Sequence, residues 1–161
     1  MCCNAPLPVL LLVVVEFTIT HMPFKPNQDS PAATSAPAWK AGWRVIGGVK
    51  KYYRSKWEAN YARYLEWLRL GGHISEWKHE PTTFWFESIK RGTRSYLPDF
   101  WVKENSGLEV YHEVKGWLDS KSKTKLKRMA KYHPTVKLLM IDAKSYASIA
   151  KSVKAFIPDW E

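Results

Sequence analysis

The stretch from Ser95 to Trp117, SYLPDFWVKENSGLEVYHEVKGW, decides the fold because it is typical of two strands joined by a tight turn. Each strand is rich in aromatic and β-branched residues, and each carries one acid, Asp99 in the first and Glu113 in the second. Acidic side chains are almost never fully buried unless a partner compensates for their charge. Two carboxylates on the inside of a sheet therefore need an explanation.

The turn between the two strands sets how they pair. A three-residue loop, Asn105-Ser106-Gly107, with Gly107 in the left-handed conformation is a favoured hairpin connection. Glu104 then faces Leu108, and every other cross-strand pair follows from this one.

Counting back from the turn places Trp101 opposite Tyr111 and Asp99 opposite Glu113. Directly opposed residues have Cβ atoms about 5 Å apart, so the two carboxylates lie side by side. Two-residue alternation along a strand puts Lys115 on the same face as Glu113. The hairpin thus predicts a cluster of two acids and one lysine.

A divalent cation is the simplest compensation for this pair, because like charges directly opposed on a sheet are destabilising. Oxygen ligands without His or Cys favour Mg²⁺, with Mn²⁺ as a substitute, and the backbone carbonyl of Val114 is a further candidate ligand beside Asp99 and Glu113. A metal lowers the pKa of bound water and polarises a phosphoryl oxygen. Lys115 is placed to orient a water or to stabilise charge that develops on a phosphate.

Each of these residues also has a purely structural interpretation. Asp99 follows Pro98 and can simply begin a strand or a turn. Glu113 and Lys115 can form a solvated stripe on an edge strand, where charges prevent aggregation. Upstream, Ser55-x-x-Glu58 is by itself a capping box at the start of a helix.

Taken in order, LPDF (97–100), HEVKG (112–116) and an upstream helix that carries Glu58 resemble the PD-(D/E)XK nuclease superfamily. The resemblance covers roughly residues 51–142 and is strongest to nucleases of the phage endonuclease I type and to transposon-end nucleases of the TnsA kind. It implies that Asp99 and Glu113 are metal ligands, that Lys115 is the catalytic lysine, and that Glu58 is an additional acid. Such enzymes usually need Mg²⁺ and cut DNA to leave a 5′-phosphate.

The remaining elements predict an α/β fold, a mixed β-sheet flanked by helices, and the resemblance implies a restriction-endonuclease-like αβββαβ core. A strand, a crossover helix and another strand in succession predict parallel pairing of residues 109–115 with 136–141. Besides the hairpin, the expected elements are a helix capped by Ser55 and ended by Gly71, strands at 74–78 and 83–89, a helix from 119 or 120 to 131, and a last helix at 146–156.

The amino terminus differs in composition from the rest. Residues 6–17 are apolar and 21–39 are rich in Pro, Ala, Ser and Thr, so we divide the chain into an amino-terminal segment and linker, 1–44, and a nuclease-like domain, 45–161. Three interpretations of the apolar run stay open: a buried extra strand, a membrane-surface element, or upstream sequence with Met22 as the true start. The adjacent Cys2 and Cys3 lack the spacing of a metal site and favour a reducing, cytoplasmic setting.

The chain is strongly basic, with a formal net charge of +10 over 161 residues. Such a surface attracts polyanions, nucleic acid first and an anionic membrane surface second, although a solvated helix face is the plain alternative. Lys50, Lys51 and Arg54 form a second basic group. The predicted DNA-binding residues lie together just after the second strand of the hairpin: Lys121, Lys123, Lys125, Lys127 and Arg128.

Tryptophan and histidine are interpreted as mainly structural. Alternation places His112 on the face opposite Glu113, which favours a structural role. Among the tryptophans, Trp117, beside Gly116, is the one candidate for stacking on a base. The tryptophans expected in the core are Trp57, Trp67, Trp85 and Trp101.

Together these features predict a metal-dependent DNA endonuclease with branched DNA as the leading specific substrate, which favours a homodimer that makes paired cuts. Transposon-end or restriction-type cleavage is the enzymatic alternative, and a nuclease-like fold that only binds nucleic acid is the alternative from another class. We expect a bacterial or phage-infected host cytoplasm and no stable membrane association.

Overall fold

The computed structural model describes residues 40–161. The apolar run, the linker and the proposed start at Met22 lie outside the described residues and stay predictions. The expected boundary between residues 44 and 45 falls inside the first described strand, β1 (Gly42–Ile46). None of the helices in residues 40–161 is both long enough and apolar enough to span a membrane.

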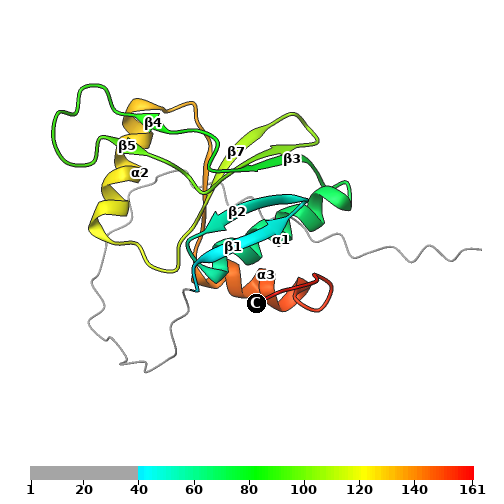
Figure 1. Cartoon of the computed structure of the whole chain (residues 1–161). Coiled ribbons are helices and arrows are strands. Elements are labelled where there is room, and N and C mark those ends of the chain that lie inside the picture. The colour runs from blue at the N-terminus through cyan, green and yellow to red at the C-terminus, as the bar shows by residue number, and fades with distance from the viewer. Residues whose placement is uncertain (1–39) are drawn as a thin grey trace, which may run out of the picture. The chain divides into compact units, whose positions relative to one another are not determined.

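A four-stranded mixed sheet forms the centre of the described residues (Figure 1). Antiparallel pairs join β3 to β6 and β6 to β7, whereas β7 and β8 pair in parallel, as the sequence predicted. The helix α2 (Ser120–Tyr132) makes the crossover between the parallel strands. In spatial order the strands are β3 (Ile74–His79), β6 (Phe100–Glu104), β7 (Glu109–Val114) and β8 (Leu138–Ile141).

The predicted register of the β6–β7 hairpin is confirmed. Gly107 has a φ of +87°, and the Glu104 N–H donates to the Leu108 carbonyl at 2.8 Å. Trp101 pairs with Tyr111, as the turn required.

Two helices cover one face of the sheet. The helix α1 (Lys56–Leu70) begins at Ser55, whose Oγ accepts from the Glu58 N–H at 3.1 Å, and the α1 residue Tyr61 contacts the even-numbered face of β7 through His112. The helix α3 (Ala143–Val153) begins three residues before its predicted start, because Asp142 caps it. The rings of Trp57 in α1 and Tyr146 in α3 stack with centroids 4.3 Å apart, so the helices lie side by side.

The other face of the sheet is covered by α2 and a small hairpin made of β4 (Phe84–Trp85) and β5 (Ser95–Tyr96) (Figure 1). The ring of Phe84 contacts Tyr111, which alternates with His112 onto this face. The expected strand at 83–89 is only two residues long, because the chain turns after Phe86. Trp85 is 58% exposed, so its assignment to the core was wrong.

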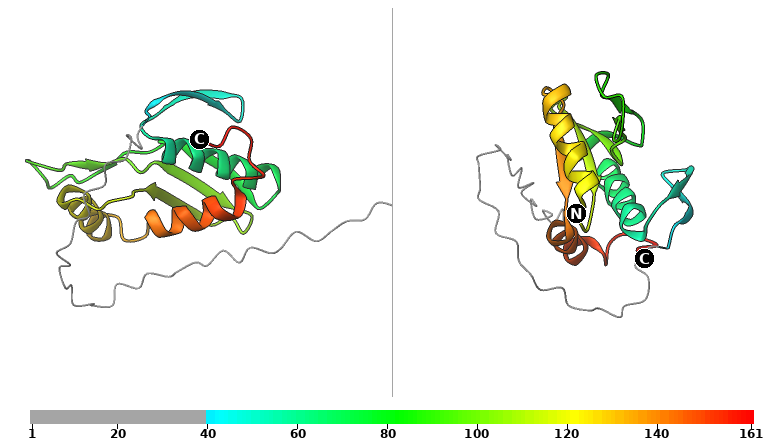
Figure 2. Two further views of the ribbon diagram at one scale, coloured as in Figure 1. Left: turned by 90° about the horizontal axis from the view of Figure 1, so that it is seen from below. Right: turned by 90° about the vertical axis from the view of Figure 1, so that its left-hand side faces the viewer.

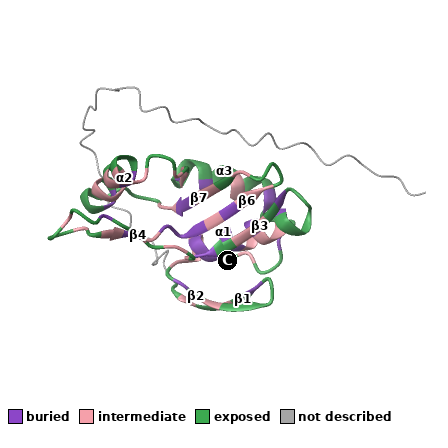
Figure 3. Ribbon diagram, turned by 90° about the horizontal axis from the view of Figure 1, so that it is seen from above, coloured by how far each residue is buried: buried purple, intermediate pink, exposed green. Residues whose placement is uncertain are grey.

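A second hairpin, β1 with β2 (Val49–Tyr53), precedes α1 and was not predicted. Gly47 and Gly48 join the strands with φ values of +59° and +77°, and two central residues with positive φ are what a type I′ turn requires. This hairpin lies against α1 (Figure 2). Buried residues follow α1, β6 and β7, so the main core lies between that helix and the sheet (Figure 3).

Candidate active site

Asp99 and Glu113 meet at the end of the sheet where β6 begins and β7 ends. Phe100 pairs with His112, and extending this register by one residue opposes the two acids. Both are buried, Asp99 at 6% exposure and Glu113 at 8%. Their side chains lie on the face opposite Phe100 and His112, both of which contact Tyr61 of α1.

Asp99 is fixed by two hydrogen bonds. Its Oδ2 accepts from the backbone N–H of Val114 at 2.8 Å, and its Oδ1 accepts from Nη2 of Arg54 at 3.0 Å. Burial, together with the charges of Glu113 and Glu58, raises the pKa of Asp99 to about 8, although the Val114 hydrogen bond and the Arg54 charge lower it. In the metal-free protein the ionised form of Asp99 is therefore costly.

Glu113 is held by a tyrosine from the small hairpin. The hydroxyl of Tyr96 donates to its Oε2 at 2.9 Å. Burial raises the pKa of Glu113, while the Tyr96 hydrogen bond and the charges of Lys115 and Lys125 lower it. Burial, together with the Glu113 carboxylate, raises the pKa of the Tyr96 hydroxyl, so Tyr96 remains a donor.

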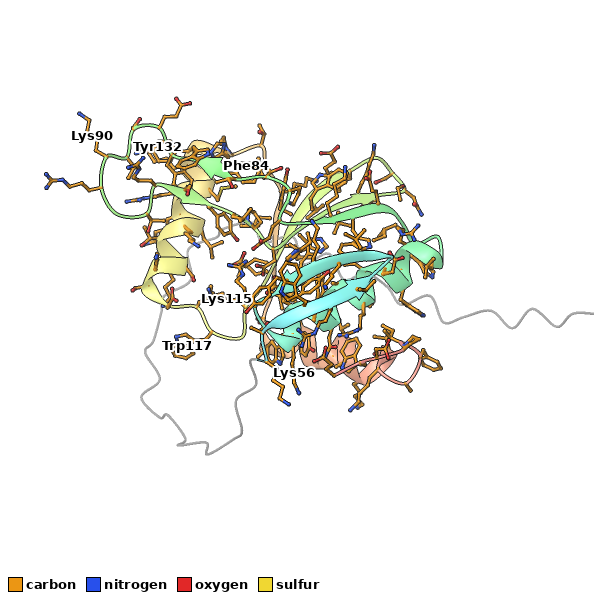
Figure 4. The ribbon with its side chains drawn as sticks, viewed as in Figure 1. Lys56, Phe84, Lys90, Lys115, Trp117 and Tyr132 are labelled. Atoms are coloured by element: carbon orange, nitrogen blue, oxygen red, sulfur yellow. The ribbon has the colours of Figure 1, made fainter. Side chains whose placement is uncertain are left out.

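Lys115 follows β7 directly, and its backbone N–H donates to the Ile141 carbonyl at 2.9 Å, which continues the parallel pairing with β8. Figure 4 shows Lys115 and Trp117 on the segment that leads from β7 to α2. Trp117 is 79% exposed. The helix α2 also approaches this site, because Nζ of Lys125 lies 5.4 Å from the centroid of the Tyr96 ring.

Glu58 reaches the same end of the sheet from the first turn of α1, and it is 3% exposed. Its Oε1 lies 2.6 Å from Nε2 of His79, and its Oε2 accepts from the Arg54 backbone N–H at 2.9 Å. The second bond differs from a strict capping box, in which the acid would accept from Ser55. Glu58 thus shares a partner, Arg54, with Asp99 but does not contact the Asp99–Glu113 pair through a hydrogen bond.

Arg54 joins these acids. Its guanidinium donates to Asp99 and Glu80, and its Nε lies 3.9 Å from Oε2 of Glu58. Burial lowers the pKa of Arg54, but the surrounding carboxylates outweigh that effect and raise it. Its side chain is 58% exposed. A partly exposed cation therefore neutralises part of a buried acidic cluster.

Glu58, His79 and Glu80 also form a group whose ligand atoms lie within 4.8 Å of one another. Glu80 has a positive φ of 48°, and its N–H donates to the Asp99 carbonyl at 2.8 Å, so the backbone ties this group to Asp99. Arg54 is bonded to Glu80 and lies beside Glu58, where a cation held by these three residues would have to compete with it.

Sequence reasoning missed the roles of Tyr96, His79 and Glu80, and it considered Arg54 only as a DNA contact. No local motif marks these residues, because each reaches the site through a tertiary contact.

The basic helix α2 presents most of its predicted DNA-binding residues to solvent. Lys121, Lys123 and Lys127 are exposed, whereas Lys125 and Arg128 are half-buried. The Arg128 guanidinium donates to the Thr93 carbonyl in the loop between β4 and β5. Ser122 and Met129 of α2 are buried, whereas Ala130 is exposed.

The donor set at Asp99 and Glu113 fits a hard divalent cation. Carboxylate oxygens are the ligands that Mg²⁺ and Mn²⁺ prefer, and each oxygen has lone pairs beyond those used in the observed hydrogen bonds. A cation between the two acids would also remove the repulsion that raises the pKa of Asp99.

Comparison with known proteins gives one informative similarity. The chain is 35% identical over 71 residues to the head completion nuclease of Enterobacteria phage T4, a stretch that covers 43% of this chain and 45% of that protein. The chain therefore matches less than half of the length of this relative. No family model and no solved structure matches the sequence.

Proposed function

We propose that this protein is a metal-dependent DNA endonuclease that hydrolyses phosphodiester bonds. The observation that carries the proposal is the hairpin register, which opposes two buried carboxylates, Asp99 and Glu113, with Lys115 two residues beyond. The similarity to a phage protein named as a nuclease supports the same function.

The order of elements gives further support. Leaving aside the two small hairpins, the chain runs α1, β3, β6, β7, α2, β8, with the last two strands parallel. This order is compatible with the αβββαβ core that the PD-(D/E)XK resemblance implies, and it therefore supports the proposal.

In this proposal Asp99, Glu113 and the Val114 carbonyl would hold Mg²⁺, and Mn²⁺ can substitute for it in experiments. When bound, the ion supplies charge stabilisation at a phosphoryl oxygen and lowers the pKa of the attacking water. Water oxygen forms the new bond to phosphorus, the bond from phosphorus to the 3′-oxygen breaks, and the products are a 3′-hydroxyl and a 5′-phosphate.

The chain's own side chains position this reaction. The Lys115 charge lowers the pKa of Glu113, and in this proposal its ammonium orients the attacking water or stabilises negative charge on the phosphate. Tyr96 holds the Glu113 carboxylate in place by its 2.9 Å hydrogen bond. Glu58 contributes through Arg54 and His79, because both of its oxygens are engaged by these residues.

A plasmid-nicking assay tests the proposal. We expect the wild-type chain to convert supercoiled plasmid to nicked circles with Mg²⁺ and not with EDTA. Binding of the plasmid with no cleavage in Mg²⁺ or Mn²⁺ would instead favour a nuclease-like fold used only for nucleic-acid binding.

The DNA structure that the enzyme cleaves is a separate part of the proposal. We propose branched DNA, cut by a homodimer in paired strands, with transposon-end or restriction-type cleavage as the alternative. Cleavage of a four-way junction is compared with cleavage of the linear duplexes that compose it. Faster cutting of the linear duplexes would overturn the branched-DNA assignment and leave the endonuclease proposal intact.

A further inference from the structure

The loop between β4 and β5, residues 86–94, is strongly basic. It carries three exposed cations, Lys90, Arg91 and Arg94, and a single acid, Glu87. No ion pair joins these cations to another of the residues 40–161. Lys90 extends away from the body of the protein at the outer part of the loop (Figure 4).

This loop is anchored rather than loosely attached. Phe86, Tyr96 and Met129 form a buried cluster between the hairpin and α2. The Phe86 N–H donates to the Arg94 carbonyl at 2.9 Å, which closes the loop near its base. Arg128 of α2 also donates to the Thr93 carbonyl, so hairpin and helix present their cations as one unit.

The same hairpin is connected to the proposed catalytic pair. Tyr96 ends β5, and its hydroxyl donates to Glu113 at 2.9 Å. A polyanion bound along the hairpin is therefore held by the same element that positions a proposed metal ligand. This connection distinguishes the loop from other basic surface positions, whose cations can serve solubility alone.

We propose that the β4–β5 hairpin is a second DNA-binding element, in which Lys90, Arg91 and Arg94 contact phosphates of the duplex that flanks the cleaved bond. The inference rests on the proposed function and adds a second DNA-binding element to the basic helix α2. Because phosphate contacts fix position without reading sequence, the hairpin sets where the duplex lies relative to Glu113. Contacts of this kind release counterions and make binding depend on salt.

The test compares two variants that lose the same charge. In the hairpin variant Lys90→Gln, Arg91→Gln and Arg94→Gln are combined. In the control variant Lys144→Gln, Lys151→Gln and Lys154→Gln are combined; these are exposed lysines on or next to α3, which packs on the opposite face of the sheet. Binding to a labelled duplex is measured over a range of KCl concentrations with EDTA, so that no cleavage occurs.

The slope of log Kobs against log salt is negative, and each phosphate contact contributes about 0.9 to its magnitude. We expect this magnitude to be smaller by about 2 to 3 in the hairpin variant than in the wild type. The control variant should keep the wild-type slope to within about one contact. A hydroxyl-radical footprint should also retract on one side of the cleavage site only. Unfolding temperatures should match, because the substituted side chains are exposed.

Equal slopes for the hairpin variant and the wild type would overturn the inference. If the wild type also cleaves plasmid with Mg²⁺, that result removes the hairpin proposal alone. If the wild type binds no duplex, both proposals are wrong. If it binds through the hairpin but never cleaves, only the proposed nuclease function is wrong.

Discussion

The carboxylate of Asp99 accepts a hydrogen bond from the backbone N–H of Val114 at 2.8 Å, across the open end of the β6–β7 hairpin. The bond replaces a ladder hydrogen bond with one from a side chain, and it places the Asp99 carboxylate beside the residue that links Glu113 to Lys115. The proximity of the two acids is thus built into the backbone of the hairpin, and Lys115 follows Glu113 by two residues.

Asp99→Asn should stabilise the metal-free protein at alkaline pH. The pKa of Asp99 in the folded state is raised to about 8. The contribution of Asp99 to folding stability is therefore fully present below its unfolded pKa of about 3.8, and it is lost as pH rises through about 8. In EDTA at about pH 9 the variant should unfold at least about 3 °C above the wild type, roughly 1 kcal/mol. At about pH 5 the difference should be small, and a variant that is less stable at both pH values would contradict the prediction.

Arg54→Gln should strengthen divalent-cation binding, because it removes a positive charge bonded to Asp99 and Glu80. Titration with Mn²⁺ should give a Kd at least about tenfold lower than that of the wild type. The corresponding gain in binding free energy is a modest share of the Coulomb repulsion between the Arg54 guanidinium and a cation a few ångströms away. The matched control is Lys51→Gln, since Lys51 donates to the His79 carbonyl and not to an acid. An unchanged or weaker affinity in the Arg54 variant would show that Arg54 does not oppose the cation.

Lys115→Ala should lower kcat by about 10²-fold or more, the usual loss when a group that stabilises developing charge is removed. Because Lys115 is not a proposed metal ligand, Mn²⁺ affinity should change far less than in a Glu113 variant. Lys115→Arg keeps the charge and should recover part of the activity. Full activity in Lys115→Ala would exclude this lysine from the reaction.

His112 should make the fold sensitive to acid. Burial lowers its pKa from 6.5 to about 4, so the stability that it contributes is present above about 6.5 and is lost as pH falls toward 4. The free energy of unfolding should fall by about 3 kcal/mol, since each pKa unit corresponds to about 1.36 kcal/mol. In His112→Gln the unfolding free energy should vary less over this window than it does in the wild type. A His112 variant with an unchanged slope would contradict the assignment.

The β6–β7 hairpin was predictable from sequence because its register depends on local features alone, a turn with Gly107 in the left-handed conformation and two-residue alternation. The same logic gave the positions of Glu113 and His112 on opposite faces. The β1–β2 hairpin carried an equally local signal, Gly47-Gly48 between two strand-like runs, and it was overlooked.

The surroundings of the acids were not predictable in this way. Arg54 and Glu80 lie 26 residues apart, and they meet because β3 ends beside the first turn of α1. Tyr96 lies in a strand of two residues, too short to give a periodic pattern, yet it holds Glu113 from 17 residues away. Such contacts depend on how elements pack, and composition and spacing do not encode that directly.

The most direct measurement compares Mg²⁺-dependent plasmid nicking by the wild type and by Glu113→Gln. Glutamine keeps an oxygen that accepts from Tyr96 but removes the charge proposed to hold the ion. The variant should fold as the wild type does and lose nicking by about 10²-fold or more. Equal nicking by the two proteins would contradict the site.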